Sequence, residues 1–332
     1  MMRAVFGMGQ HLIPFFFSPN DLAELQEYVE IDTSRAIASI EELDPAERPG
    51  VDTLITAWGG PEITADVLEK LPGLRAIVHA AGTVRFVDPE AWRRGIVVSS
   101  GAWANAVPVA EFAVAMITLA GKDAFWVART YAREQREIFR EAELPAIGNY
   151  GRTVGIVGAS RIGSRVIRML QAYDMRVLVF DPFCTEEQAR LLGAELVSDL
   201  SELARRSTIL SIHAPSRPET WGMISREVLA ALPDDATVIN TARADIVDQE
   251  ALIAELRSGR LRAVLDVTEP EVLPKGHILY TLPNVYLTPH LAGAAGNELR
   301  RLGESAVAEV RRHALGEPLK YAVEVAELAR MA

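Results

Sequence analysis

The sequence contains a single cysteine, Cys184, among its 332 residues. One thiol excludes a disulfide within the chain and is typical of proteins in a reducing compartment, so we expect a cytoplasmic protein. Basic residues are also scarce, since the 34 Lys and Arg residues are outnumbered by 45 Asp and Glu residues, which gives a net charge of −11. This balance argues against broad binding to nucleic acid or to an anionic membrane, either of which usually requires a basic face. Any anionic ligand must therefore be held by a few placed groups.

Long hydrophobic runs are absent as well. The N-terminus has one basic residue and no apolar stretch of adequate length, so we expect no secretory leader. The longest apolar stretch, residues 107–120, contains Pro108 and Glu111 and is too short to span a bilayer, so it predicts a buried helix. There is no Cys/His spacing for zinc, no P-loop and no G-x-S-x-G turn, and we therefore expect no metal site.

The sequence is that of an ordinary globular protein, with 49% hydrophobic and 24% charged residues and a length typical of about two domains. Short β-prone runs alternate with helical patterns along the chain, which predicts parallel sheets with helices on both faces. The expected strands are 3–6, 52–57, 74–80, 95–99, 153–157, 177–180, 208–213, 237–240, 261–267 and 285–288. The expected helices include 19–28, 64–71, 107–140 with a break at Gly121-Lys122, and 296–314.

Residues 151–181 read in order as strand, tight turn, helix, strand and acid. The turn runs from Gly158 to Gly163 as GASRIG, and Asp181 ends the second strand. Such a turn brings backbone N–H groups and the positive end of a helix to a pyrophosphate, while the acid accepts hydrogen bonds from a ribose. Asp181 lies 23 positions after Gly158, close to the fingerprint's spacing of about 20. The whole pattern favours a dinucleotide site over an ordinary strand-to-helix turn.

Ser160 takes the place of the middle glycine of the fingerprint. A serine leaves less room for a phosphate, but it can cap a helix that begins at Arg161 by accepting a hydrogen bond from the N–H near Gly163.

The aromatic residues of the segment 125–131 are compatible with packing within the monomer or with a contact between subunits, and we favour the contact.

Several segments together resemble the D-isomer-specific 2-hydroxyacid dehydrogenase family, which includes phosphoglycerate dehydrogenases and glyoxylate/hydroxypyruvate reductases. They are Asn105 with VAE at 109–111, GIVGASRIG at 155–163, SIHAP at 211–215 with PET at 218–220, NTAR at 240–243, LDVTEPE at 265–271 and LTPHLAG at 287–293. The resemblance implies an α/β fold of two Rossmann-like, doubly wound parallel-sheet domains, with the cofactor domain inserted into a flavodoxin-like substrate domain. The implied bounds are 1–103 with 294–332 for the substrate (catalytic) domain and 104–293 for the NAD-binding domain.

The resemblance implies three catalytic residues, Arg243, Glu271 and His290. An arginine can hold the carboxylate of a 2-oxo acid and polarise its carbonyl, and a histidine can donate a proton near neutral pH to the oxygen on which charge develops. A carboxylate beside the histidine fixes its orientation and favours its charged form. Two glutamates compete for that role: spacing from Asp266 selects Glu271, whereas the family's Glu-Pro pair selects Glu269. We follow the spacing.

The resemblance further implies NAD as cofactor and a small 2-oxo or 2-hydroxy acid as substrate, in a homodimer without nucleic acid or membrane. The implied NAD-binding residues are Gly158, Ser160, Arg161, Ile162, Gly163, Asp181, His213, Ala214, Pro215, Thr220, Thr241, Ala242, Arg243, Asp266, His290, Ala292 and Gly293. The implied substrate-binding residues are Ala81, Gly82, Arg243 and His290. His213 admits a structural role as well. The expected function is an NAD-dependent oxidoreductase that interconverts a 2-oxo acid and its D-2-hydroxy acid, and the alternative is a nicotinamide-nucleotide-sensing binding protein without turnover.

Overall fold

A computed structural model of the chain describes residues 2–328. The chain divides into two compact units, one formed by residues 1–105 with 294–332 and the other by residues 106–293. We call them unit 1 and unit 2 and describe each by itself.

Unit 1 contains a five-stranded sheet in the order β2-β1-β3-β4-β5, in which every pairing is parallel. This order, with the first two strands exchanged, is that of flavodoxin-like folds. Most strands lie close to their expected positions, but the two-residue β2 was not predicted because it is too short to show a pattern. The strands are β1 (Met2–Gly7), β2 (Val29–Glu30), β3 (Val51–Thr56), β4 (Ala76–His79) and β5 (Val97–Ser100).

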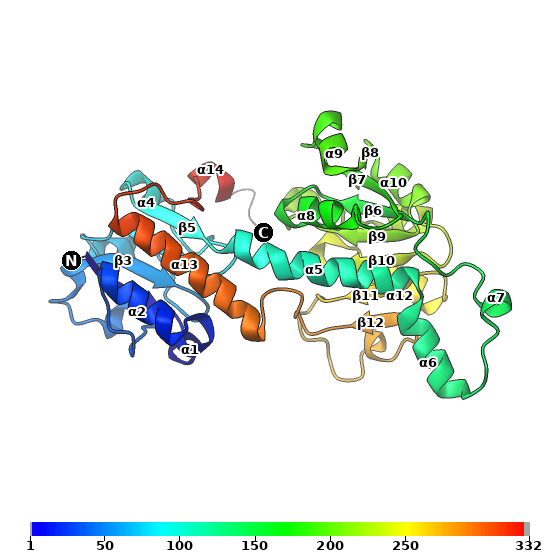
Figure 1. The fold of residues 1–332 in the computed structure, drawn as a ribbon, viewed down its shortest axis with the longest axis horizontal. Helices are drawn as coiled ribbons and strands as arrows, with labels where there is room; N and C mark the ends of the chain where they lie inside the picture. Colours follow the sequence, from blue (N-terminus) through cyan, green and yellow to red (C-terminus); the bar gives the residue numbers. More distant parts are fainter. Residues whose placement is uncertain (1, 329–332) are drawn as a thin grey trace. The chain divides into compact units, whose positions relative to one another are not determined.

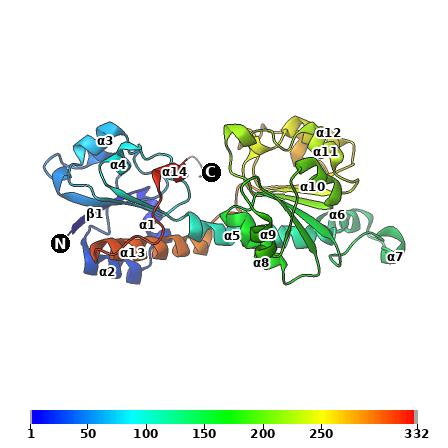
Figure 2. The same cartoon turned by 90° about the horizontal axis from the view of Figure 1, so that it is seen from above.

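Helices cover both faces of the unit 1 sheet, and Figure 2 shows α1, α2 and α13 together below it and α3 and α4 above it. The lower face buries a cluster that includes Phe6, Phe16 and Leu302. The upper face buries another that includes Leu54, Leu68 and Ile77. The helices are α1 (Ile13–Phe16), α2 (Pro19–Tyr28), α3 (Ala65–Lys70), α4 (Glu90–Arg93), α13 (Leu299–Ala314) and α14 (Val325–Leu328).

Unit 2 contains a seven-stranded parallel sheet in the order β12-β11-β10-β9-β6-β7-β8. The order reverses between β6 and β9, and such a switch point is where open α/β sheets bind ligands, outside the carboxyl ends of the strands. The strands are β6 (Thr153–Val157), β7 (Arg176–Phe180), β8 (Glu195–Leu196), β9 (Ile209–Ile212), β10 (Thr237–Asn240), β11 (Arg262–Leu265) and β12 (Val285–Leu287). Two parallel-sheet α/β units confirm the predicted fold class.

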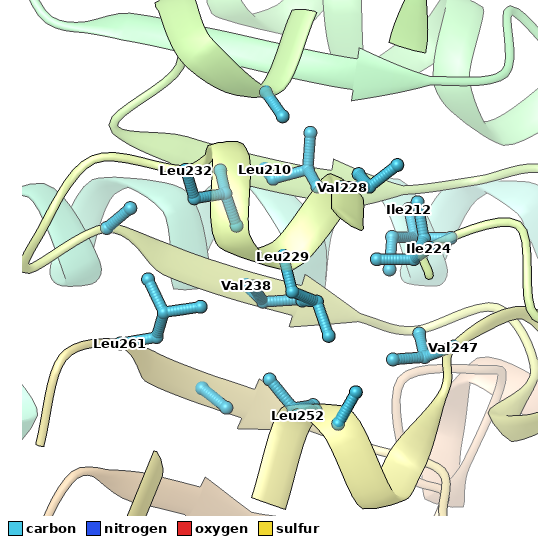
Figure 3. Packing of buried hydrophobic residues seen from close by; sticks show 14 of the residues in the cluster. Leu210, Ile212, Ile224, Val228, Leu229, Leu232, Val238, Val247, Leu252 and Leu261 are labelled. Atoms are coloured by element: carbon cyan, nitrogen blue, oxygen red, sulfur yellow. The ribbon is translucent and has the colours of Figure 1, made fainter. Parts of the chain in front are cut away.

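Two helical layers enclose the unit 2 sheet (Figure 1). One layer packs α10, α11 and α12 on β9 and β10, and Figure 3 shows side chains such as Leu210, Leu229, Val238 and Leu252 pointing into this core. The other layer packs α5, α8 and α9 on the opposite face. The helices are α5 (Ala102–Gly121), α6 (Ala124–Glu134), α7 (Arg140–Glu143), α8 (Arg161–Leu170), α9 (Glu186–Leu192), α10 (Leu200–Arg206), α11 (Arg226–Ala231) and α12 (Gln249–Arg257).

Helix α5 is longer than the apolar stretch predicted, because it extends back to Ala102. By length and hydropathy it is the one helix in the described chain that could cross a membrane, but 56% of that window is buried. Ala110, Ala113 and Ile117 pack against the unit 2 sheet. A buried core helix, as expected, accounts for this composition.

The aromatic residues that follow α5 mostly pack within the chain. Phe125 stacks on Tyr286 with a centroid distance of 4.3 Å, and Trp126 is buried. Tyr131 is exposed. The subunit contact that we favoured for this segment therefore has no support from Phe125 and Trp126, since both already have partners within the monomer.

Candidate active site

The turn between β6 and α8 has the close packing that a dinucleotide turn requires. Gly158 has φ +96°, and a Cβ there would lie 2.8 Å from the backbone nitrogen of Ala214. A Cβ on Gly163 would lie 1.9 Å from the carbonyl oxygen of Gly158. The turn, the start of α8 and the loop after β9 thus approach each other at backbone distance, which larger residues would prevent.

Ser160 caps α8, as predicted. Its side chain accepts a hydrogen bond from the N–H of Gly163 at 3.2 Å, and the helix begins at Arg161. A helix start presents backbone N–H groups and the positive end of the helix dipole, which together suit a phosphate anion.

Asp181 follows β7 and lies against this turn. One carboxylate oxygen accepts the N–H of Ala159 at 2.8 Å and the other accepts the N–H of Phe183 at 2.8 Å. A carboxylate offers about four lone-pair sites, so each oxygen can still accept a hydrogen bond from a ribose hydroxyl. The acid is therefore placed and oriented by the backbone before any ligand binds.

The loop after β9 carries His213, Ala214, Pro215 and Thr220. His213 is buried, its Nε2 lies 2.9 Å from the Ser211 hydroxyl, and burial lowers its pKa from 6.5 to about 3. The Thr220 hydroxyl donates to the carbonyl of Pro215 at 2.7 Å and shapes the loop. These contacts favour a structural role for the His213 ring. The backbone of the loop lies at the switch point of the sheet.

The loop after β10 presents Arg243. The buried Asn240 side chain donates to the carbonyl of Arg243 at 2.8 Å and accepts from the N–H of Ala242 at 3.0 Å. Asn240 had no predicted role, although a polar residue at the end of an apolar strand was a usable signal. Beside it, the Thr241 hydroxyl is buried without a hydrogen-bond partner among the described residues. A buried unpaired hydroxyl is costly, so it suggests a partner that a ligand would supply.

His290 and Glu271 are paired. The Nδ1 atom of His290 lies 2.6 Å from Oε1 of Glu271, and the side chains are 43% and 60% exposed. His290 has φ +52°, a left-handed backbone that few non-glycine residues adopt. Because Nδ1 faces the carboxylate, Nε2 is the ring nitrogen left for a substrate. Of the two candidate glutamates, the structure brings Glu271 to the histidine.

Asp266 holds the loop that carries His290. Its carboxylate accepts hydrogen bonds from the Thr288 hydroxyl at 2.6 Å and from the N–H groups of Leu291 and Ala292 at 2.8 and 2.9 Å. Its carbonyl accepts the N–H of His290 at 2.9 Å. Asp266 was predicted among the NAD-binding residues. Its side chain is buried and supports the loop from within the protein.

Ala81 and Gly82 belong to unit 1, where they follow β4. The Ser100 hydroxyl donates to the carbonyl of Gly82, which fixes the loop. Within the described part of the chain the N–H groups of Ala81, Gly82 and Thr83 have no hydrogen-bond partner. Consecutive free amides at the carboxyl end of a strand form a concavity that suits a carboxylate. Just before them, burial lowers the pKa of His79 to about 4, and its Nδ1 lies 2.9 Å from the Thr56 hydroxyl.

The residues of unit 2 fit the dinucleotide that the sequence implied. The capped helix start suits the pyrophosphate, Asp181 suits a ribose, and the unpaired Thr241 hydroxyl lies in the loop beside Arg243. All of them follow strands of one parallel sheet and so lie along its carboxyl edge. Within residues 2–328 no group of three or more His, Cys, Asp and Glu could hold a metal ion.

Comparison with known proteins agrees with this geometry. Residues 115–292 match the sequence model of the D-isomer specific 2-hydroxyacid dehydrogenase, NAD binding domain. The chain is 34% identical over 288 residues to a glyoxylate reductase from Korarchaeum cryptofilum, covering 85% of this chain and 86% of that protein. It is 33% identical over 287 residues to a D-3-phosphoglycerate dehydrogenase from Methanocaldococcus jannaschii, covering 86% of this chain but 53% of that protein. The chain thus spans about half the length of this relative.

A solved structure supports the same relationship. The D-lactate dehydrogenase from Aquifex aeolicus, complexed with NAD and lactic acid, superposes with a TM-score of 0.69 at 25% identity, covering 95% of this chain and 96% of that one. The sequence match, the strand order and the glycine turn at the switch point all indicate the same family. The chain therefore belongs to the D-isomer-specific 2-hydroxyacid dehydrogenase family, and residues 115–292 are its NAD-binding domain.

Proposed function

We propose that this protein is an NAD-dependent oxidoreductase that interconverts a small 2-oxo acid and its D-2-hydroxy acid. The observation that carries the proposal is the 2.6 Å pairing of His290 with Glu271. Glu271 follows β11 and His290 follows β12, in the same sheet whose loops carry Arg243 and the glycine turn. The proton donor His290, the cation Arg243 and the cofactor turn therefore lie along one edge of that sheet.

When bound, NADH would supply the hydride that reduction of the carbonyl carbon requires. Arg243 binds the substrate carboxylate with two parallel hydrogen bonds and polarises the neighbouring carbonyl. The free Nε2 of protonated His290 donates its proton to the carbonyl oxygen as negative charge develops there. Glu271 holds the ring through Nδ1 and stabilises its positive charge. In unit 1, the amides of Ala81 and Gly82 can donate hydrogen bonds to a carboxylate.

The test is turnover of a panel of 2-oxo acids with NADH, followed by the loss of NADH absorbance. We expect steady turnover of at least one acid, and a loss of about 10²-fold or more in kcat for His290→Gln, since general acid catalysis contributes that much. The alternative, a nicotinamide-nucleotide-sensing binding protein, would bind NADH and turn over none of the acids.

We further propose NAD(H) as the preferred cofactor. The Asp181 carboxylate would accept a hydrogen bond from the ribose 2′-hydroxyl and would repel a 2′-phosphate, and Pro182, Phe183 and Cys184 supply no compensating cation. The KM for NADH should be lower than that for NADPH in steady-state kinetics. The reverse order would refute the preference.

Finally, we propose that the protein acts as a homodimer in the cytoplasm. Tyr131 and Phe139 are 60% and 62% exposed on the segment of α6 and α7, which extends away from the unit 2 sheet in Figure 1. Exposed aromatic side chains are typical of subunit interfaces. Sedimentation equilibrium tests this, and a dimer that Tyr131→Glu dissociates is the expected result.

A further inference from the structure

Residues 269–272, which carry Glu271, have little to hold them in place. Each of the four is exposed, and Val272 is 80% exposed, so no buried side chain anchors the segment. Among the described residues no hydrogen bond between main-chain atoms reaches these four positions. The position of the Glu271 carboxylate therefore depends on side chains that bind the backbone around it.

Two side chains do so. The buried Thr268 hydroxyl lies 2.9 Å from the carbonyl oxygen of Pro270 and 3.2 Å from that of Glu271. The Gln249 side chain makes a two-point pair with the backbone of Glu269: its Nε2 donates to the carbonyl at 2.6 Å, and its Oε1 accepts the N–H at 2.9 Å. Such a two-point pair fixes the backbone on both sides of the Glu269 Cα in position and orientation.

Gln249 is itself attached to a rigid support. It is the first residue of α12, whose N-cap Asp248 accepts the N–H of Ala251 at 2.9 Å. The preceding Ile246 and Val247 are buried in the core shared with α11, and they follow directly from the loop that begins at Arg243. Gln249 thus connects the loop after β10, which presents Arg243, to the loop after β11, which presents Glu271.

We propose that Gln249 is a positioning residue for the reaction, which keeps the Glu271 carboxylate on His290 Nδ1 and in register with Arg243. This inference rests on the proposed function, because it assigns Gln249 an effect on the acid-base pair. Gln249 acts only through the backbone of Glu269, so it should influence kcat and not cofactor binding.

The first test needs no turnover. In Gln249→Met a side chain of similar length replaces the amide, and the ring signal of His290 is followed by NMR with labelled histidine and identified by its loss in His290→Gln. We expect the signal to move toward its position in Glu271→Gln, because the ring loses its fixed partner. The matched control is Gln10→Met, since the Gln10 amide also binds the backbone at two points in unit 1, at the carbonyl of Ser34 and the N–H of Ala36. The control should leave the signal unmoved.

The second test is kinetic. Gln249→Met should lower kcat about tenfold, because small displacements of a catalytic group can cost up to about 10²-fold. The KM for the 2-oxo acid, the affinity for NADH and the urea midpoint should change little, and in a Glu271→Gln background the same substitution should have no further effect. Gln10→Met should leave kcat as it is.

The proposal is overturned if Gln249→Met leaves the His290 signal and kcat unchanged. It is equally overturned if the substitution lowers kcat by the same factor with and without Glu271, since its effect would then not pass through this carboxylate. Absence of turnover in the unmodified protein would refute the proposed function instead, and the NMR comparison would still decide whether Gln249 positions the pair.

Discussion

At the scale of single residues, the exposure of the His290–Glu271 pair decides what it can contribute. Both side chains are well exposed, and ion pairs in such surroundings add about 0–1 kcal/mol to stability. The pair therefore adds little to folding, which agrees with the acid-base role that we propose for it. The buried carboxylate of Asp266 fixes the neighbouring loop and has the structural part.

Single substitutions should distinguish the two glutamates. Glu271 holds the His290 ring at Nδ1, so Glu271→Gln should lower kcat for reduction of the 2-oxo acid by about tenfold or more, measured in steady-state kinetics. Glu269→Gln should leave kcat unchanged, because only the backbone of Glu269 is held, by Gln249. The opposite behaviour of the two variants would transfer the role to Glu269.

His213 should make the stability of the protein depend on pH. Burial lowers its folded-state pKa to about 3, below the unfolded value of 6.5, so the unfolded chain binds a proton that the folded chain does not. Stability should therefore be lost as pH falls below about 6.5, by about 1.4 kcal/mol for each pH unit. The free energy of urea unfolding, measured between about pH 6 and pH 4.5, should fall less steeply in His213→Gln.

The control for this experiment is Ser211→Ala, which removes the hydrogen-bond partner of His213 but no titrating group. Its unfolding free energy should retain the slope of the unmodified protein. Equal slopes in His213→Gln and the unmodified protein would contradict the assignment.

At the scale of elements, the serine cap and the two glycines at the start of helix α8 have different roles in the cofactor turn. Ser160 satisfies one N–H of the first turn, whereas Gly158 and Gly163 allow backbone to meet backbone. The two contributions predict different results on substitution.

Ser160→Gly should leave NADH affinity nearly unchanged and lower the unfolding free energy by a few tenths of a kcal/mol, while Ser160→Ala should cost about 1 kcal/mol. Gly163→Ala should cost about 1–3 kcal/mol and weaken NADH binding, because the new methyl group meets the carbonyl of Gly158. Urea unfolding and NADH titration measure both. A loss of NADH affinity beyond about tenfold in Ser160→Gly would make the hydroxyl a ligand contact.

At the scale of the whole molecule, each core cluster draws its residues from one unit. The two clusters of the seven-stranded sheet lie within residues 106–293. The clusters of the five-stranded sheet combine the N-terminal residues with α13 and Val323. One unit is therefore continuous in sequence, whereas the other needs two distant segments.

A fragment of residues 102–293, which keeps α5 whole, should fold and bind NADH without turning over a 2-oxo acid. It retains both cores of unit 2 and the cofactor turn, and it lacks the loop of Ala81 and Gly82. Cooperative urea unfolding and NADH fluorescence test the fragment. Loss of cooperative unfolding would show that unit 2 depends on the rest of the chain.

The sequence by itself determined the features that depend on neighbouring residues. The alternation of strands and helices, the turn from Gly158 to Gly163, the cap at Ser160 and the acid at Asp181 follow from periodicity, glycine conformation and short-range hydrogen bonds, and the structure contains each of them. The family's motifs added the fold class.

The tertiary structure decided what depends on contacts between distant residues. Local patterns do not show the strand order, the burial of the His213 ring or the hydrogen bonds between Gln249 and Glu269. Spacing favoured Glu271 over Glu269, but only the adjacent loops of β11 and β12 bring its carboxylate to His290. The physical reason is that hydrogen bonds and burial act through space. Neighbouring parallel strands bring together loops that are about 20 residues apart in the chain.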